Sequence, residues 1–559
     1  MEILDPLAAP PPPPAASGPP FEVLPGVFAD PALGVRWTDP APRPPAASKA
    51  DAPAPLKANG GLAPYVPSAS APWDRARALH LLRRTGYGAR PAAVDAVLAL
   101  GPDAAVQALV DGAASIGALA PPAWHDDAPP APPPNNAPQA EQDEYRRVLQ
   151  VYLDANTQWI YEMEWRTITE GLGGTEADAL AGAARAFHER LTVGWHDHFV
   201  ASVEAYTLAG WLSRYWRTLQ RHALGDFRAF VAEIGTSPAM LVYLNGIQNR
   251  VGAPNENYAR ELMELFTMGA EANGQPNYTQ QDVAQAARCL TGYTVDVYGT
   301  LEAVFVPAWH DNGIKTVLGR TGNWGHDDLV QILFDERANE IATFVARKLY
   351  RDVVYDTPNE TVVAQLAGVL LANDFALAPA VAALLKSAHF FDGDSIGARI
   401  KSPLEHVLGV HAESGTGAIP ALQDTIRAIT FVTDQRLFYP PNVAGWPGHR
   451  DWLTSSTLPT RWLYTNAILS GIEAVPEALR GVALALPSPY VARDLAVDFA
   501  TLWLGTAVDP ADTPAVDRLI GVLLGDIPEY EWDPTAPGAG TRLMGLALHL
   551  AVQPEYQLA

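Results

Sequence analysis

The stretch PWDRARALHLLRRTGYGARPAAVDAVLALG, residues 72–101, shows how this chain is built. It predicts one helix that ends at Gly86 and Gly88, and a second helix that begins near Pro91 and ends at Gly101. Proline in the first turn and glycine after the last are common helix boundaries. Apolar residues recur with helical spacing along most of the chain. A mainly α-helical protein is therefore predicted, as a large irregular multi-helix domain.

Outward from this stretch, the sequence divides into three regions. Residues 1–70 form a proline/alanine-rich arm that we expect to be extended or partly disordered. Residues 71–475 are predicted to form a helical core domain with a proline-rich insertion at 120–138, and residues 476–559 a C-terminal helical segment packed on that core. Within the core, helices are expected at 141–171, 178–202, 207–224, 226–234, 255–268, 279–290, 327–333, 339–350, 362–371, 381–387 and 402–410.

Composition narrows the classes of partner and site. The chain has 62 acidic and 38 basic side chains, and its net charge of -24 repels phosphate backbones and anionic headgroups. Nucleic acid and membrane surfaces are not expected partners, and no apolar run reaches the roughly 20 residues of a membrane span. Cys289 is the only cysteine, so no intramolecular disulfide can form, and any metal must be held by His, Asp or Glu.

The first basic residue is Arg36, and no uninterrupted apolar run precedes it. The beginning of this sequence therefore lacks the pattern of a secretory signal, and a cytoplasmic location is expected. A periplasmic or secreted location stays open if a partner carries the protein or if a signal was removed.

The segment VGWHDHFVAS, residues 193–202, sets two histidines around one aspartate. Residues two apart on a helix point about 200° apart, so both imidazoles can chelate one metal only if the helix breaks at Gly194. His198 shares a stripe with Trp195 and is predicted to face the core, whereas His196 is predicted to face away. Two interpretations stay open for His198: a hydrogen-bonded core histidine, or a ligand or general base completed by distant carboxylates.

The segment GAPNENYARELMELFTMG, residues 252–269, supplies the best candidate carboxylates. Glu261 and Glu264 lie three apart and share a helix face, the spacing that helical metal sites and acid/base pairs use. The structural alternative is an ordinary salt bridge to Arg260 or to a distant arginine.

Another candidate site lies in AVFVPAWHDNGIKTVLG, residues 303–319. Two short runs flank Asn312-Gly313, which predicts a β-hairpin near 303–318 with His310 and Asp311 at its tip and Lys315 across the turn. The alternative is a polar turn without a functional role.

The aromatic loop LFYPPNVAGWPGHRDW, residues 437–452, is too apolar for an idle surface loop. It is predicted either to fill the core or to line a small-ligand pocket, to which Asn442, Trp446 and His449 would contribute. The chain contains no P-loop, GxGxxG, GxSxG or HExxH motif, so nucleotide, serine-hydrolase and zincin functions lose their usual support.

A series of stretches in a fixed order resembles the large bacterial family catalogued as domain of unknown function 1800, over roughly residues 75–465: HLLRRTGYGA, LTVGWHDHFVAS, SPAMLVYLNGIQNRVGAPNENYARELMELFTMG, YTQQDVAQAARCLTGYTV, WHDNGIKTVLG, ARKLYRDVV, KSPLEHVL and LFYPPNVAGWPG. The resemblance implies a large helical protein and brings no established reaction. It also implies a partner, because members are often encoded beside a sulfatase-like family, domain of unknown function 1501. Many members are exported, whereas this chain shows no evident signal and carries a proline-rich arm.

Three hypotheses follow from these residues. The first is an enzyme, an oxidoreductase or hydrolase of unknown substrate, with a transition metal (Zn, Mn, Fe or Cu) in a His/carboxylate site. In this hypothesis the metal ligands are His196, His198, His310 and Asp311, and the catalytic residues are Glu261, Glu264 and Lys315. The second is a non-catalytic assembly or secretion partner that docks through its proline arm, and the third is a carbohydrate-binding protein with an aromatic loop.

Overall fold

The two helices expected from residues 72–101 form as predicted in the computed structural model, which describes residues 53–272 and 274–559. Helix α1 (Arg75–Thr85) begins at Asp74, whose carboxylate accepts a hydrogen bond from the Arg77 amide at 3.0 Å. Helix α2 (Pro91–Leu100) begins at its proline and ends at Gly101, which has φ +78°. The described part is mainly α-helical, with only two-stranded sheets, which confirms the predicted fold class.

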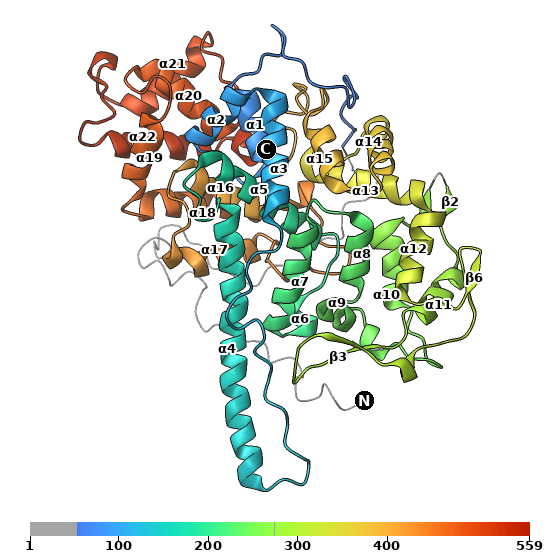
Figure 1. The fold of residues 1–559 in the computed structure, drawn as a ribbon. Coiled ribbons are helices and arrows are strands. Elements are labelled where there is room, and N and C mark those ends of the chain that lie inside the picture. The colour runs from blue at the N-terminus through green and yellow to red at the C-terminus, as the bar shows by residue number, and fades with distance from the viewer. Residues whose placement is uncertain (1–52, 273) are drawn as a thin grey trace.

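The remaining helices follow one another along the chain, with both short and long connections (Figure 1). The first set comprises α3 (Pro102–Ile116), α4 (Gln139–Gly171), α5 (Ala179–His196), α6 (Val203–Tyr206), α7 (Ala209–His222), α8 (Phe227–Gly235), α9 (Pro238–Tyr243), α10 (Asn257–Glu261) and α11 (Gln280–Cys289). The second comprises α12 (His326–Glu336), α13 (Ala338–Val353), α14 (Glu360–Ala372), α15 (Leu377–Leu385), α16 (Pro403–Glu413), α17 (Gln423–Val432), α18 (Thr457–Gly471), α19 (Val475–Leu484), α20 (Ala492–Leu504), α21 (Thr513–Leu524) and α22 (Ala539–Ala551).

Helix α5 lies at the centre of the fold and packs against α1, α2, α3, α4 and α7. Its apolar stripe of Phe187, Leu191 and Trp195 is buried, as helical spacing predicts. The helix ends at His196 rather than at residue 202. Asp197 occupies the C-cap, and its carboxylate is held by a distant backbone amide, so the chain turns away before His198.

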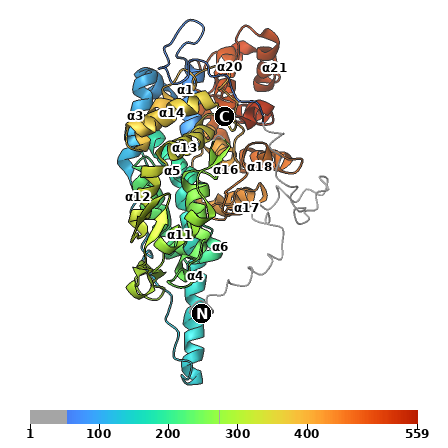
Figure 2. The same ribbon diagram turned by 90° about the vertical axis from the view of Figure 1, so that its right-hand side faces the viewer.

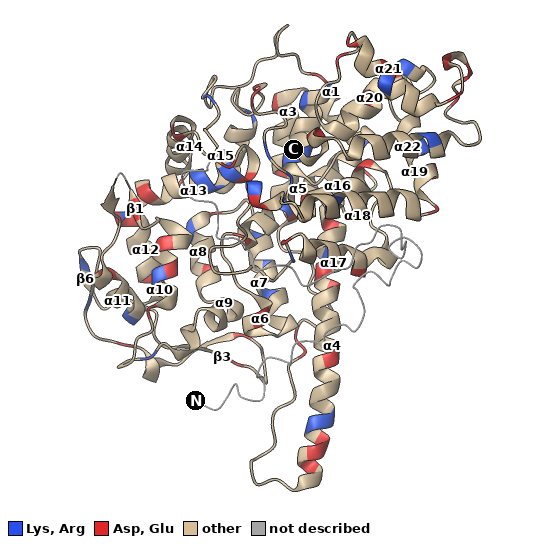
Figure 3. Cartoon of the chain, turned by 180° about the vertical axis from the view of Figure 1, so that it is seen from behind, with Lys and Arg blue, Asp and Glu red and all other residues tan. Residues whose placement is uncertain are grey.

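Helix α4 projects far beyond the rest of the molecule (Figures 1 and 2). The proline-rich insertion runs beside it, and Trp124 of this segment stacks on Trp159 of α4 with ring centroids 5.6 Å apart. The Trp124 indole N–H also donates to Glu162 at 2.7 Å. The projecting turns carry both acidic and basic residues (Figure 3), and Arg147 pairs there with Glu144 at 2.7 Å.

The predicted β-hairpin around Asn312-Gly313 is wrong in its pairing. Strand β4 (Ala303–Phe305) pairs with β3 (Tyr293–Val295), which precedes it in the chain. Strand β5 (Lys315–Val317) pairs with β6 (Arg320–Gly322), which follows it. A further pair joins β1 (Glu271–Ala272) to β2 (Gln275–Pro276). Pro307 interrupts the first run with a 3-10 turn, and the Asp311 carboxylate accepts from the Gly313 amide at 2.8 Å, which holds the Asn-Gly segment in a local turn.

Two long-range connections fix the ends of the described chain. Residues 53–70 lie on the body, where the Tyr65 amide donates to the Lys386 carbonyl at 2.9 Å; residues 1–52 of the predicted arm lie outside the described residues. Near residue 559, Ile400 forms an isolated antiparallel bridge with Leu558, so the last residues lie beside the segment that precedes α16. The apolar core is continuous from α1 through α22.

Among the described residues, no single helix is long and apolar enough to cross a bilayer. Helices α2 and α3 reach that length only together, across a bend of 118°, and both pack against α5.

Candidate functional site

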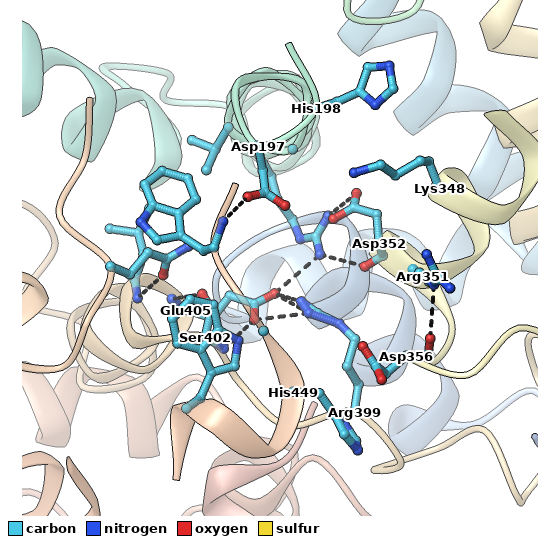
Figure 4. Close-up of a pocket in the computed structure, with 18 of the residues that line it drawn as sticks. Asp197, His198, Lys348, Arg351, Asp352, Asp356, Arg399, Ser402, Glu405 and His449 are labelled. Carbon is cyan, nitrogen blue, oxygen red and sulfur yellow. Dashed lines mark hydrogen bonds and ion pairs between the residues drawn. The ribbon is translucent and has the colours of Figure 1, made fainter. Parts of the chain in front are cut away.

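A cavity of about 530 Å³ lies between the end of α5, the end of α13, the start of α16 and the aromatic loop. Five of the eight stretches that carry the family resemblance contribute to its walls. The lining includes Tyr87, Arg190, Asp197, His198, Lys348, Arg351, Asp352, Asp356, Arg399, Ser402, Glu405, Trp446 and His449. Four guanidinium or ammonium groups and four carboxylates therefore face one space (Figure 4), which we call the charged cleft.

Asp197 is a carboxylate of the cleft with one oxygen held in place and the other left free. Its Oδ1 accepts a hydrogen bond from the Trp446 amide at 2.7 Å, while its Oδ2 has no hydrogen-bonding partner among the described residues. Burial raises the pKa of Asp197 to about 6, against the opposing effects of Lys348 and the Trp446 amide. At neutral pH this carboxyl can therefore both accept and release a proton.

Gly445 makes this arrangement possible. It has φ +84°, and a Cβ at this position would lie 2.3 Å from Asp197 Oδ1. Only glycine lets the aromatic loop approach the carboxylate closely enough for the following Trp446 amide to donate to it.

Lys348 and His198 lie beside Asp197 (Figure 4). The Lys348 amine forms no hydrogen bond or ion pair with any described residue, and burial lowers its pKa although Asp197 opposes the change. The His198 Nε2–H donates to the Phe266 carbonyl at 2.9 Å, so Nδ1 carries a lone pair, and this atom is buried without a partner. Burial, reinforced by Lys348, lowers the pKa of His198, so the ring is neutral.

A buried ion-pair network supports one wall of the charged cleft. Arg190 donates to Asp352 at 2.8 Å and to Glu405 at 3.2 Å, and Arg399 donates to the same Glu405 at 3.0 Å. Burial alone would raise the pKa of Glu405, but Arg399 and Arg190 hold it at about 2. Ser402 caps α16 and donates its amide to Glu405 at 2.7 Å, which fixes the carboxylate at the helix N-terminus.

The side chains at the opening of the charged cleft have fewer hydrogen-bonding partners than those of the ion-pair network. Arg351 is exposed and donates through Nε to the Asp356 carbonyl at 3.2 Å. His449 has φ +47° and packs edge-on against Tyr355. On the inner side, the Tyr87 hydroxyl is buried without a hydrogen-bonding partner among the described residues, and burial raises its pKa.

Three predicted site residues line the charged cleft: His198, Trp446 and His449. His198 faces inward beside Trp195, as predicted, with ring centroids 5.5 Å apart. Asn442 does not line the cleft; its side chain accepts from the Ala444 amide at 2.8 Å and shapes the aromatic loop.

His196 points away from His198, as helical geometry predicts, but it is fully buried rather than exposed. The Tyr215 hydroxyl donates to the Phe199 carbonyl at 2.6 Å, so His196 Nδ1–H donates to the Tyr215 oxygen at 2.8 Å. Burial lowers the pKa of His196 to about 3. The centroid of its ring lies 5.4 Å from those of the Trp216 and Trp446 rings, so His196 is part of the aromatic core.

The predicted carboxylates of the 252–269 segment lie elsewhere. The segment leaves α10 through a π-helical turn at Leu262–Thr267, which shifts the face on which Glu264 lies. Glu264 accepts from the Tyr278 hydroxyl at 2.7 Å. Burial and the neighbouring Glu264 raise the pKa of Glu261. Arg260 pairs with Glu256 at 3.1 Å rather than with either glutamate.

The residues of the predicted hairpin tip form a structural network. Asp311 receives two hydrogen bonds from Arg288 at 2.7 and 3.1 Å, and these hold its pKa at about 2. Lys315 is 1% exposed and donates to the Trp324 carbonyl at 2.8 Å and to the Asp311 carbonyl. His310 donates to the Thr291 carbonyl at 2.8 Å.

The expected convergence of these groups into one metal site does not occur in the described part of the chain. No group of three or more His, Cys, Asp or Glu side chains there has the arrangement of a metal site. Each predicted ligand instead has its own separate hydrogen-bonding partner: Tyr215 for His196, Phe266 for His198, Thr291 for His310 and Arg288 for Asp311.

Several residues of the cleft were missed from the sequence although the stretches that contain them stood out. Asp197 lies between the two histidines, Lys348 and Asp352 lie in ARKLYRDVV, and Glu405 lies in KSPLEHVL. One signal in the sequence could have identified them: charged residues occur in several of the separate stretches that together carry the family resemblance.

Fold and site together define a large helical protein with a charged cleft formed by distant stretches of one chain. The sequence profile of the family described as "Protein of unknown function (DUF1800)" matches residues 80–558. The chain belongs to this family. No curated protein and no solved structure matches it significantly.

Proposed function

We propose that this protein is an enzyme that performs acid–base chemistry on a small polar molecule in the charged cleft. Asp197 accepts and returns a proton, and Lys348 stabilises negative charge that develops on the substrate. His198 offers a fixed lone pair beside them. The observation that carries this proposal is the open Oδ2 of Asp197, held toward a cavity of about 530 Å³ by the Trp446 amide.

Three features support this assignment. The cavity has the size of small-molecule sites. The carboxylates of Asp352 and Glu405 are paired with Arg190, so this network can hold the wall rigid without reacting. Asp197 and Lys348 are instead left without a paired counterion within hydrogen-bond distance, which costs stability in a structural role and is useful in a catalytic one.

The test is a turnover screen with matched variants. Purified protein is incubated with a mixture of small polar metabolites, and their consumption is followed by mass spectrometry. We expect Asp197→Asn to lower the consumption of any substrate by about 10² to 10⁴-fold, the usual contribution of a positioned acid–base group. Asp335→Asn, an exposed aspartate on α12, is the control and should leave turnover unchanged. Equal turnover by wild type and Asp197→Asn would refute the role of Asp197.

A second candidate function is that of an assembly partner, which the projecting α4 favours. Val148 and Val151 are 37% and 58% exposed on the projecting turns, beside the proline-rich insertion. Exposed apolar groups flanked by charges are typical of protein interaction surfaces. A member of the sulfatase-like family, domain of unknown function 1501, is the partner that the family resemblance implies.

This second function is tested by binding. The double variant Val148→Ser and Val151→Ser should reduce co-purification of such a partner, while the far-UV circular dichroism stays unchanged. A variant that lacks residues 1–52 tests the proline arm as the alternative dock. Undiminished binding by the serine variant would remove α4 from the interface.

A further inference from the structure

We propose that Lys348 forms an imine with a small 2-oxo acid, that Arg351 binds the carboxylate of this acid, and that Asp197 transfers the proton. This inference rests on the proposed function, because it uses the same cleft and the same carboxyl group. It adds the class of substrate and a covalent step.

The position of Lys348 separates it from the other described lysines. Its side chain leaves α13 and ends in the space near His198, Asp197 and Asp352 (Figure 4), and it is the only described lysine that lines the charged cleft. Lys315 is held by backbone carbonyl groups. Lys386, on the far side of α15, pairs with an aspartate at 3.0 Å.

Lys401 is the informative comparison. Burial lowers its pKa to about 7, and its amine lies 3.9 Å from the centre of the Tyr556 ring. It does not line the cleft, although Ile400 and Ser402 on either side of it do. Lys401 therefore has the basicity of a reactive lysine without access, whereas Lys348 has both a lowered pKa and an open cavity.

The choice of lysine at this position fits a covalent role. The chain contains 32 arginines and only 6 lysines, and the other cations in the cleft are arginines. Arginine stays protonated and cannot act as a nucleophile, whereas a lysine that burial partly deprotonates can.

The step balances with the groups in the cleft. The neutral amine of Lys348 attacks the carbonyl carbon of the oxo acid, and a proton passes from nitrogen to oxygen to give a carbinolamine. Protonated Asp197 donates its proton to the carbinolamine hydroxyl, which leaves as water while the nitrogen lone pair forms the C=N bond. The products are a protonated imine, one water molecule and the Asp197 carboxylate, and the reverse sequence releases the acid.

Arg351 supplies the second contact of the substrate. It lies three residues after Lys348 on α13, so the two side chains share a helix face. Its guanidinium forms no ion pair with any described carboxylate, and only Nε has a hydrogen bond, to the Asp356 carbonyl. The remaining N–H groups can bind a carboxylate in the bidentate manner that arginine favours.

The experiment is reductive trapping with glyoxylate and sodium cyanoborohydride at neutral pH, followed by peptide mapping. Reduction of the imine leaves a carboxymethyl group on the reacting lysine, and six lysines make the assignment simple. We expect Lys348 to be labelled severalfold faster than the exposed Lys57, because Lys348 faces the cleft in which Arg351 can hold the glyoxylate carboxylate. Lys348→Arg keeps the positive charge and should lose this label. Arg351→Met should remove the preference for glyoxylate over acetaldehyde.

The outcomes distinguish this inference from the function on which it rests. Labelling that reaches Lys57 and Lys386 but leaves Lys348 unmodified would overturn the imine, even if Asp197→Asn still abolishes turnover. Labelling of Lys348 together with full turnover by Asp197→Asn would support the imine and refute the acid–base role of Asp197. A glyoxylate preference that persists in Arg351→Met would overturn the assignment of the carboxylate contact.

Discussion

Replacement of Asp197 by asparagine gives a prediction that needs no substrate. The variant keeps an oxygen that can accept the Trp446 amide hydrogen, but it removes the charge. The pKa of Asp197 rises from 3.8 in the unfolded chain to about 6 in the folded protein, mainly through burial. Since one unit corresponds to about 1.4 kcal/mol, the ionised group destabilises the folded state by about 3 kcal/mol.

The sign of the effect follows from proton binding. Between about pH 4 and about pH 6 the folded protein holds a proton on Asp197 that the unfolded chain has released. Wild-type stability therefore falls through this group as pH rises across that window, whereas the stability of Asp197→Asn does not. The difference in unfolding free energy between variant and wild type should increase by about 3 kcal/mol in favour of asparagine from about pH 4 to about pH 7.

Urea denaturation of both proteins, followed by tryptophan fluorescence at several pH values, measures this difference. Groups distant from Asp197 titrate equally in the two proteins, so the difference reports Asp197 together with the neighbours to which its charge is coupled, such as Lys348. A difference that stays constant across the window would show that Asp197 has an ordinary pKa. The physical basis of the proposed acid–base role would then be refuted.

Three more predictions test the surroundings of the cleft. Gly445→Ala should destabilise the protein by more than Gly252→Ala, by about 2 kcal/mol or more in thermal unfolding, since both glycines have positive φ but only the first has close neighbours; equal losses would contradict the contact argument. Arg190→Met should cost about 3 kcal/mol in denaturant unfolding because it leaves Asp352 without its cation and Glu405 with Arg399 alone, whereas Arg185→Met, in a more exposed pair, should cost about 1 kcal/mol or less; similar costs would contradict a buried network. Trp124→Ala should speed limited proteolysis within residues 121–138, as the stacking on α4 is lost, and an unchanged cleavage rate would show that the segment is held by other contacts.

The helical class and most helix positions could be predicted because they depend on local signals. Pro91 and Gly101 mark the ends of α2, as predicted, and α11 begins after the capping box of Thr279 and Asp282, close to the predicted helix start at residue 279. The predicted hairpin was wrong because each run pairs with the neighbouring segment on its other side and not across Asn312-Gly313. Residues 303–305 pair with 293–295 and not with the run across Asn312-Gly313.

The candidate site was harder to predict, because its side chains come from helix ends and from a loop that are far apart in the sequence. Helical geometry correctly separated His196 from His198 and placed His198 inward. It could not show that the intervening Asp197 lies beyond the helix end, where a backbone amide from the aromatic loop holds it. The role of Lys348 depends on a missing ion pair, which no local pattern reveals.

The strand bridge between Ile400 and Leu558 bears on the order in which the molecule is completed during synthesis. Arg399 and Lys401, on either side of Ile400, share backbone hydrogen bonds with Ala559 and Gln557. One wall of the cleft is therefore finished by residues that leave the ribosome about 150 residues after α16 begins. The helices around α5 can fold while this wall is still unpaired, and the cleft would be complete only after α22 and residues 557–559 have docked.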